Sequence, residues 1–495
     1  MAVTEREAKL TEQTRAFLAE PKKLFIGGDW VDAADGRTFA SVDPATDTEL
    51  AQVALAGPED VDRAVAAARE AFDDGRWSEI DPRQRAKVLF TLADLIEQNI
   101  ASIAQVDVLD NGKPTMFAFG EAAHAVSVFR YFAGLADKVY GETNPTDARS
   151  FMYTLREPMG VCGQVIPWNY PAAMAAWKIA PALAFGNTVV IKPAEETPLS
   201  ALWIAKLAQE AGVPAGVLNV LTGDGPTTGA PLVRHPGVDK IAFTGSTEVG
   251  RKILEASTTN LARVTLELGG KSPNIVFPDA DLANAIPQSA FGIFFNAGQV
   301  CHAGSRLLVQ RAIHDELIEG FKQAAAGWKV GDGLDEGVMV GPLVSRQQLD
   351  RVTGYLEVGP AEGAEVVFGG SRVAGSDGYF VEPTVFDGVK PDMRIAREEI
   401  FGPVLSVLTF DDVDEAIRIA NDTMYGLAAG IWTKDLSVAH RVARGIRAGT
   451  IWVNQYGMND PGLGFGGYKA SGYGRELGIH AVDTYTQTKS VWIRL

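Results

Sequence analysis

The sequence has little of what marks secreted or membrane-spanning proteins. Only 2 of its 495 residues are cysteine, Cys162 and Cys301, so a disulfide framework is not expected and the reducing cytoplasm is favoured. The first twenty residues contain no apolar stretch of the kind that forms a secretory signal. The most apolar segment, residues 172–185, is interrupted by Lys178 and Pro181 and is too short to cross a bilayer, so no membrane association is expected.

Basic runs and metal-ligand patterns are lacking as well. Lys and Arg total 45 against 62 Asp and Glu, and the resulting formal net charge of −17 argues against binding to nucleic acid. The 6 histidines show no spacing typical of a zinc site, so no metal is expected. Neither a G-x-S-x-G nucleophile motif nor a P-loop lysine motif occurs.

The chain instead has the texture of an α/β protein of two or three domains. Its length and its 46% hydrophobic content exceed what one ordinary core needs. Helical patterns cover residues 58–72 and 81–98, and Asp81 and Pro82 suit a helix start. Short apolar runs then alternate with helical segments, which predicts parallel sheets of βαβ units. These runs lie at 161–166, 188–191, 217–221, 240–243, 274–276, 306–309, 405–410 and 430–432.

Segments near both ends differ from this pattern. Residues 1–20 read as one polar helix. Residues 150–156 and 484–495 alternate like half-exposed strands that lie apart from the βα units. Two such strands can pair with each other or across a subunit boundary, and we expect an oligomer.

Cys301 and Glu267 are the first candidates for chemistry. Cys301 lies among Gly298, Gln299 and Gly304, residues that indicate a tight turn, and this context favours a nucleophile as much as a structural thiol. Glu267 ends an apolar run before two glycines, and strand ends in α/β sheets face ligands. A glutamate shielded from water there predicts a raised pKa and a general base, with a salt-bridged core glutamate as the alternative.

Three other segments suggest groups that bind an oxyanion or a nucleotide. Asn169 lies between two prolines in VIPWNYP, and its amide would suit a developing oxyanion or a plain turn. Residues 241–250 predict a strand, a glycine turn and a helix start, whose free N–H groups attract phosphate. Glu195 follows a strand that ends at Lys192, and it would accept ribose hydroxyls and repel the extra phosphate of NADP. A solvated loop pair is the alternative for these two side chains.

Seven separated segments together resemble the aldehyde dehydrogenase superfamily, from about residue 25 to residue 495. They are VIPWNYP, IKPAEETP, FTGSTEVG, LELGGKSPN, NAGQVCHAGSR, EEIFGPVLSV and GFGGYKASGYGRELG. The match is with the NAD-preferring, hydrolytic branch of that family. One departure is visible: the family often has a proline just before FGG, and this chain has Gly464, which loosens a loop near the expected substrate tunnel.

The resemblance implies an α/β fold with a Rossmann-like cofactor domain, a second α/β catalytic domain and a small β oligomerisation arm. The cofactor domain would comprise residues 1–136 and 155–265, and the catalytic domain residues 266–465. Residues 137–154 and 466–495 would form the arm and the C-terminal segment. The family forms dimers and tetramers, so we expect a homo-oligomer, with a homotetramer as the favoured form.

The resemblance also implies roles for individual residues. Cys301 would be the nucleophile and Glu267 the general base, and Asn169 with the Cys301 backbone N–H would form the oxyanion hole. Lys178 and Glu476 match positions that assist proton movement. The residues expected to bind NAD are Ile166, Pro167, Trp168, Lys192, Glu195, Gly225, Gly245, Ser246, Val249, Leu268, Gly269, Glu399 and Phe401. Those expected to line a substrate tunnel are Tyr170, Met174, Trp177, Phe294, Tyr456 and Phe465.

The expected activity is NAD-dependent oxidation of an aldehyde to a carboxylic acid. A thiohemiacetal on Cys301 would lose hydride and leave a thioester, which water activated by Glu267 would hydrolyse. The uncharged tunnel residues predict an apolar aliphatic or aromatic aldehyde. Three alternatives stay open: a CoA-acylating dehydrogenase, which Glu267 disfavours; a thiol esterase, which the cofactor motifs disfavour; and a non-catalytic protein, which the intact Cys301, Glu267 and Asn169 set disfavours.

Overall fold

The computed structural model describes residues 3–495, and its larger sheet contains the apolar runs predicted between residues 160 and 245. Eight strands pair in the order β19-β11-β10-β7-β8-β9-β1-β2. In that order they are Gly472–Tyr473, Arg263–Glu267, Lys240–Thr244, Val161–Val165, Thr188–Lys192, Leu218–Val220, Leu24–Ile26 and Asp29–Val31. The five strands from β11 to β9 are parallel, and β19, β1 and β2 are antiparallel additions at the two edges.

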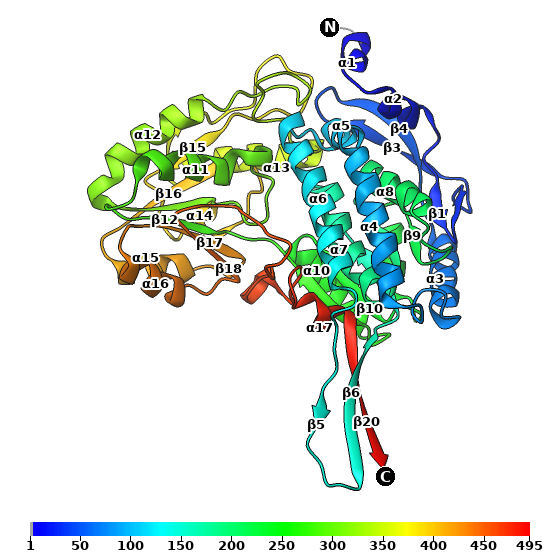
Figure 1. Cartoon of the computed structure of the whole chain (residues 1–495). Helices are drawn as coiled ribbons and strands as arrows, with labels where there is room; N and C mark the ends of the chain where they lie inside the picture. The colour runs from blue at the N-terminus through cyan, green and yellow to red at the C-terminus, as the bar shows by residue number, and fades with distance from the viewer. Residues whose placement is uncertain (1–2) are drawn as a thin grey trace.

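Helices cover this sheet in the right-hand lobe of Figure 1. They are α3 (Pro58–Asp73), α4 (Pro82–Gln98), α5 (Ile100–Asn111), α6 (Thr115–Leu135), α7 (Pro171–Ala184), α8 (Leu199–Glu210), α9 (Ala230–Arg234) and α10 (Thr247–Ser257). The predicted helix over residues 81–98 is confirmed, because the Arg83 backbone N–H donates to the Asp81 side chain at 2.9 Å and Pro82 opens α4. Helix α6 packs against α4 and α7, which bears on the site below.

A second sheet forms the other lobe. Seven strands pair in the order β14-β15-β16-β13-β12-β17-β18. In that order they are Glu365–Phe368, Thr384–Asp387, Val404–Phe410, Arg306–Gln310, Pro273–Val276, Ala428–Trp432 and Thr450–Val453. All its neighbouring strands are parallel except β14 and β15. Its helices are α11 (Leu282–Phe294), α12 (His314–Ala326), α13 (Arg346–Ala361), α14 (Arg394–Arg397), α15 (Val413–Asn421) and α16 (Leu436–Gly445).

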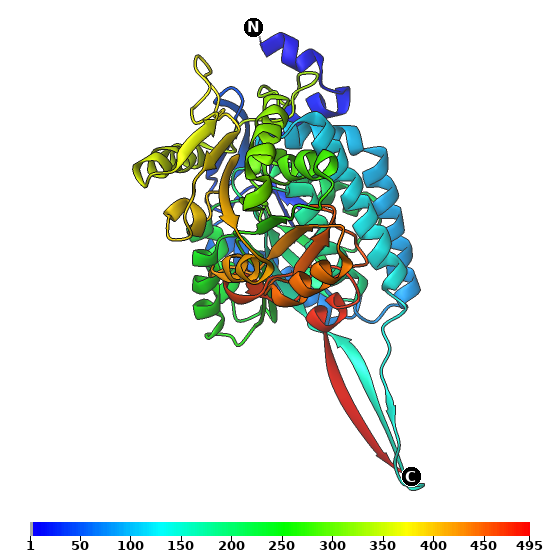
Figure 2. The same ribbon diagram turned by 90° about the vertical axis from the view of Figure 1, so that its left-hand side faces the viewer.

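The two exposed strands predicted outside the βα units pair with each other. Strand β20 (Thr486–Arg494) runs antiparallel to β6 (Ser150–Pro158), and the short β5 (Thr143–Asn144) lies on the other side of β6. This ribbon projects from the body, with the C-terminus at its tip, in Figures 1 and 2. Short helix α17 (Ala481–Tyr485) joins it to the body. Trp492 near the tip is 77% exposed.

The N-terminal prediction needs a correction. Residues 1–20 do not form one polar helix but contain two, α1 (Val3–Ala8) and α2 (Glu12–Ala19), and residues 1–2 lie outside the described part. Thr11 starts the second helix because its hydroxyl accepts from the Thr14 backbone N–H at 3.1 Å. Phe17 is buried, so α2 is anchored to the body. The hairpin of β3 (Thr38–Asp43) and β4 (Thr48–Ala54) follows.

The observed architecture agrees with the predicted fold class of two α/β sheets and a small β arm. The sheets do not establish the predicted domain limits. Strand β11 (Arg263–Glu267) crosses the boundary predicted between residues 265 and 266. Within residues 3–495, no helix has the length and apolar character that a bilayer crossing requires. The parallel strands and the loops that follow them bring side chains of both lobes to one cavity.

Candidate active site

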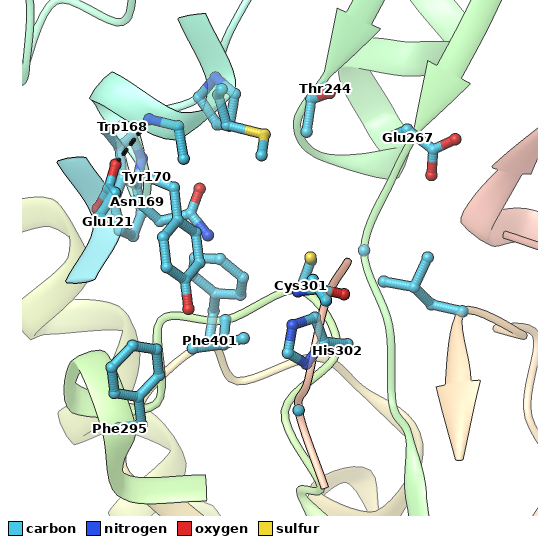
Figure 3. A pocket seen from close by; sticks show the side chains of 18 of the residues that line it. Glu121, Trp168, Asn169, Tyr170, Thr244, Glu267, Phe295, Cys301, His302 and Phe401 are labelled. Atoms are coloured by element: carbon cyan, nitrogen blue, oxygen red, sulfur yellow. Dashed lines mark hydrogen bonds between the residues drawn. The ribbon is translucent and has the colours of Figure 1, made fainter. Parts of the chain in front are cut away.

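A cavity of about 720 Å³ is lined by residues of both lobes. Figure 3 shows the Cys301 side chain between Glu267 on one side and Asn169 with Tyr170 on the other. These residues come from different elements: Glu267 ends β11, and Asn169 lies in the loop between β7 and α7. Three of the five residues with predicted catalytic roles, Cys301, Glu267 and Asn169, are therefore neighbours around one space.

An unusual backbone turn places Cys301. Helix α11 ends at Phe294, and the following Asn296, Ala297 and Gly298 have φ values of 51°, 52° and 69°. Residues other than glycine rarely adopt this left-handed backbone region. An added Cβ at Gly298 would lie 2.0 Å from the Gly402 carbonyl oxygen. The tight turn that the local sequence predicts is thus present. It reverses the chain so that Cys301 reaches the cavity.

The Cys301 thiol is poorly ionised in this environment. Burial raises its pKa to about 12, and the negative charges of Glu399 and Glu267 add to the rise. A thiol with such a pKa carries very little thiolate near neutral pH. Attack by this sulfur therefore requires that its proton leaves as the sulfur–carbon bond forms, or that a cation comes near.

Asn169 is held from several sides. Its side-chain Nδ2 donates to the Gln299 backbone carbonyl oxygen at 2.9 Å. Its backbone carbonyl oxygen accepts from Asn296 Nδ2 and Lys113 Nζ, both at 2.9 Å. The side chain is buried, with 4% of its surface exposed. An amide nitrogen carries two hydrogens, so one N–H of Asn169 remains for a ligand in the cavity.

Glu267, in contrast to Asn169, is not held by hydrogen bonds of its side chain to the described residues. The residue is 4% exposed, and neither carboxylate oxygen accepts a hydrogen bond of normal geometry from residues 3–495, although the nearby Gly467 backbone N–H offsets part of the rise in its pKa. Burial, followed by the charge of Glu476, raises its pKa well above the usual range. The space around it is kept by Gly466, where an added Cβ would lie 2.8 Å from Glu267 Oε1. Buried polar groups are normally bonded, so an unpaired carboxylate indicates a partner such as water or substrate.

Lys178 and Glu476 form an ion pair beside Glu267. Lys178 is fully buried and also donates to the Thr244 hydroxyl at 2.7 Å. Glu476 lines the cavity and Lys178 does not. The second oxygen of Glu476 has no partner among the described residues, so this pair offers a proton-accepting atom next to Glu267.

The predicted cofactor residues divide into two groups. Those that line the cavity are Pro167, Trp168, Gly245, Ser246, Leu268, Gly269, Glu399 and Phe401. Those that lie outside its lining are Ile166, Lys192, Glu195, Gly225 and Val249. Val249 of the second group lies in the first turn of α10, where its N–H donates at 3.2 Å to the hydroxyl of Ser246, the residue that caps this helix. Lys192 donates to the Gly223 carbonyl oxygen at 2.6 Å and pairs with Glu195 at 3.3 Å.

Glu399 depends on the two glycines that follow Glu267. The Gly270 N–H donates to Glu399 Oε1 at 2.9 Å, and an added Cβ at Gly269 would lie 2.2 Å from Glu399 Oε2. Burial raises the pKa of Glu399 to about 7. The glycine pair predicted to end the strand therefore has a second role, which is to admit this carboxylate to the cavity.

Five of the six residues predicted to line a substrate tunnel lie on this cavity, and one does not. Tyr170, Met174, Trp177, Tyr456 and Phe465 line the cavity. Phe294 does not, because it is 0% exposed and packs edge-on against Phe321 and Trp328 inside the lobe of the seven-stranded sheet. Phe291 and Phe295, which stack on each other with ring centroids 4.8 Å apart, line the cavity from this region instead.

The motif analysis misses the contribution of α6 to the cavity. The lining residues from this helix are Met116, Phe117, Gly120, Glu121 and His124. None of the seven motifs includes α6, so the resemblance gave no reason to select it. The available signal was Glu121 and His124 within a largely apolar stretch of this helix, since burying such groups is costly without partners.

His302, next to the nucleophile, is also part of the lining. Burial lowers its pKa to about 4, so it is neutral at physiological pH. Its carbonyl oxygen accepts from the Tyr456 hydroxyl at 2.7 Å, which fixes the turn after Cys301. Groups of three or more His, Cys, Asp or Glu side chains suited to a metal ion do not occur in the described residues.

Known proteins share this architecture. The aldehyde dehydrogenase family model matches residues 30–491. An aldehyde dehydrogenase of Aspergillus niger is 51% identical over 489 residues, covering 99% of this chain and 98% of its own length. The mitochondrial benzaldehyde dehydrogenase of Antirrhinum majus is 49% identical over 471 residues, covering 95% of this chain and 88% of its own length.

Solved structures agree with the sequence relatives. An NAD+ complex of aldehyde dehydrogenase from Bacillus cereus has a TM-score of 0.97 and 48% identity, covering 98% of this chain and 99% of that one. The predicted fold is confirmed, and the prediction of NAD as cofactor agrees with the molecule bound to this neighbour. The chain belongs to the aldehyde dehydrogenase family.

Proposed function

We propose that this protein oxidises an apolar aliphatic or aromatic aldehyde to the carboxylic acid, with NAD, through a thioester on Cys301. One observation carries the proposal: a thiol lies in a single cavity between a buried unpaired carboxylate, Glu267, and a fixed amide, Asn169 (Figure 3). The two steps of such a reaction need these two groups on opposite sides of the sulfur.

In the first step the Cys301 sulfur bonds to the aldehyde carbon while the thiol proton passes to water. The carbonyl oxygen becomes an oxyanion, and the free N–H of Asn169 donates to it. One donor of this kind typically contributes about 10²- to 10³-fold in rate. The rigid bonding of Asn169 favours this role, because a preorganised donor needs no rearrangement when charge develops.

The oxyanion then collapses and the carbon releases hydride. NAD, when bound, accepts this hydride. Two features of the predicted cofactor residues suit such a dinucleotide: α10 begins just after Ser246, and Gly225 has open space where a Cβ would stand. Glu195, 44% exposed beside Lys192, would accept the ribose hydroxyls.

In the second step water attacks the thioester carbon, and the thiolate of Cys301 leaves. The unpaired oxygens of Glu267 would accept the proton of that water. Burial and the charge of Glu476 raise the pKa of Glu267, so its carboxylate binds a proton more strongly than an exposed glutamate does. The Lys178–Glu476 pair would then take the proton away, because Glu476 adjoins both Glu267 and Lys178.

The proposed substrate class follows from the cavity lining. Aromatic and thioether side chains dominate, among them Phe117, Tyr170, Trp177, Phe291 and Phe295. Such a lining favours an apolar chain or ring over a charged group. The benzaldehyde dehydrogenase of Antirrhinum majus, a relative at 49% identity, is consistent with this class.

A panel of aldehydes tests the proposal directly. We expect NADH formation with benzaldehyde and hexanal. Their kcat/KM should be at least about tenfold above that for the charged succinic semialdehyde, which corresponds to about 1.4 kcal/mol of discrimination. Preference for the charged aldehyde would contradict the substrate class. No NADH formation with any aldehyde would contradict the activity.

Two alternative activities can each be distinguished from the proposed one by changing one component of the assay, CoA or NAD. A CoA-acylating enzyme would form acyl-CoA when CoA is added, whereas we expect free carboxylic acid as the product. A thiol esterase would hydrolyse an ester at full rate without NAD, and we expect that activity to be minor. Glu267 disfavours the first alternative because transfer to CoA needs no base for water.

We also propose a cytoplasmic homo-oligomer, with a homotetramer as the favoured form. The arm of β6 and β20 supports it, because Phe151, Leu155, Trp492 and Ile493 are exposed apolar side chains on one thin ribbon. Exposed apolar surface of this kind marks association sites. Light scattering on the purified chain measures the assembly directly.

A further inference from the structure

A buried polar cluster lies behind the cavity wall that carries Asn169. Its members come from the end of α5 and the beginning of α6, a region outside all the motifs: Asp107, Asp110, Asn111, Lys113 and Glu121. All five are buried, and Glu121 reaches the cavity. Figure 3 places Glu121 on the same side of the pocket as Trp168, Asn169 and Tyr170, away from Glu267.

Lys113 makes three contacts at the centre of this cluster. Its ammonium group forms an ion pair with Glu121 and donates to the Asn169 carbonyl oxygen at 2.9 Å. It also lies 4.8 Å from the centroid of the Tyr170 ring. Only 3% of Lys113 is exposed, so its charge is shared among these partners rather than with water.

The same cluster holds the rest of the loop between β7 and α7. Asn111 Nδ2 donates to the Trp168 carbonyl oxygen at 2.9 Å. Glu121 Oε1 accepts from the Ala173 N–H at 3.1 Å, in the first turn of α7. Residues 168, 169 and 173 are thus each bonded to one side chain from the α5–α6 region.

Charge balance makes Glu121 the partner of Lys113. Burial, and next the charge of Glu121, raise the pKa of Asp107 well above its usual range, and burial does the same for Asp110. Among the described residues, neither Asp107 nor Asp110 forms an ion pair with Lys113, so Glu121 is its partner. The ion pair therefore neutralises a carboxylate that otherwise would face the cavity where the oxyanion develops.

We propose that Lys113 and Glu121 are positioning residues for oxidation, holding the Asn169 loop so that the Asn169 amide meets the developing oxyanion. This inference rests on the proposed function, because it needs Asn169 to be the oxyanion donor. Neither side chain takes part in a bond that forms or breaks. Lys113 acts on the backbone carbonyl of Asn169, and Glu121 acts on the backbone N–H of Ala173.

A double-mutant cycle between Lys113→Met and Asn169→Ala tests this coupling. The measurement is the single-turnover rate of NADH formation with benzaldehyde and saturating NAD+. We expect Lys113→Met alone to slow this rate about 10- to 100-fold, the cost of a misplaced group. In the Asn169→Ala background the same substitution should slow it less than about threefold, because the group it positions is gone.

Two further variants separate positioning from folding. Lys113→Arg keeps the charge and should restore part of the rate. Arg85→Met is a matched control, because Arg85 is another buried cation that donates to backbone carbonyls, including Ala184 at the other end of α7 at 3.1 Å. We expect Arg85→Met to lower the melting temperature and leave the single-turnover rate unchanged.

The possible results distinguish this inference from the proposed function. If Asn169→Ala leaves the rate unchanged, the proposed oxyanion donor is wrong. If Asn169→Ala slows the rate and the two losses simply multiply, or Lys113→Met has no effect, only the positioning role is overturned. If Lys113→Met does not fold, Glu121→Gln replaces it in the cycle, since it breaks the ion pair but keeps an oxygen for the Ala173 N–H, and the same non-additivity is required.

Discussion

The two sides of Cys301 are built in opposite ways. On one side Asn169 is fixed through its amide and its carbonyl oxygen by Gln299, Asn296 and Lys113. On the other side neither oxygen of Glu267 accepts a hydrogen bond of normal geometry from the described residues. A donor for an oxyanion works best when it is already in place, whereas a base must exchange protons with a water that comes and goes. The contrast between a fixed and a free group thus separates the two chemical steps.

The means of construction differ as well. Polar side chains from α5 and α6 hold the Asn169 loop, but glycines make room for the acidic side: an added Cβ at Gly466 would meet Glu267, and one at Gly269 would meet Glu399. Substitution should therefore damage the two sides differently. A lost partner loosens Asn169, and an added side chain displaces Glu267.

The largest expected effect is on the free side. Glu267→Gln keeps the shape but removes the base, so steady-state turnover should fall about 10²- to 10⁴-fold. Single-turnover NADH formation should survive, because hydride release precedes the attack of water. Stopped-flow absorbance separates the two rates, and an equal loss of both would contradict the division of roles.

The acidic side also controls ionisation of the thiol. Because the pKa of Cys301 is raised to about 12 by burial, Glu399 and Glu267, its thiolate fraction should rise about tenfold per pH unit between pH 7 and 9. Alkylation by iodoacetamide without NAD should follow that slope. Glu399→Gln and Glu267→Gln remove negative charge, lower the pKa and speed alkylation at fixed pH. Asn169→Ala changes no charge and is the control; a plateau in the wild-type rate near pH 8.5 would refute the raised pKa.

A smaller effect is expected away from both sides. Glu195→Ser removes the charge proposed to repel a 2′-phosphate, so the preference for NAD over NADP should shrink by about tenfold, or 1.4 kcal/mol. The ratio of kcat/KM values for the two cofactors measures it. Single-turnover kinetics with NAD should change little, and an unaltered ratio would reject the role of Glu195.

The smallest effect on chemistry is expected at the arm. Removing residues 488–495 takes away most of β20 but keeps the buried Tyr485, which packs in the body. Light scattering should report a smaller assembly, while the rates of both chemical steps change less than about twofold in whatever folded species remains. An unchanged assembly size would count against the arm as an association surface.

Sequence reasoning reached the fold and the chemical groups because each has a local signature. The capped helix after Asp81, the apolar strands and the glycine turn around Cys301 are encoded within a few residues. The single helix expected over residues 1–20 fails because Thr11 starts a new helix. Phe294 fails as a tunnel residue because neighbouring phenylalanines in one helix point to different sides, and the sequence does not say which side faces the cavity.

What the sequence could not supply is contact between distant segments. Lys113 and Asn169 are 56 positions apart, and the bond between them exists only because α6 packs against α7. Similarly, the absence of partners for Glu267 depends on glycines some two hundred residues away, such as Gly466. Tertiary packing, rather than any motif, decides which charged groups are bonded and which are left free.

The most direct test of the account is to trap the thioester. Glu267→Gln mixed with NAD+ and benzaldehyde, quenched in acid and analysed by intact-protein mass spectrometry, should carry one benzoyl group on Cys301. Cys301→Ala should carry none and form no NADH. Formation of NADH by Glu267→Gln with no acyl group on Cys301, or undiminished oxidation by Cys301→Ala, would contradict the account.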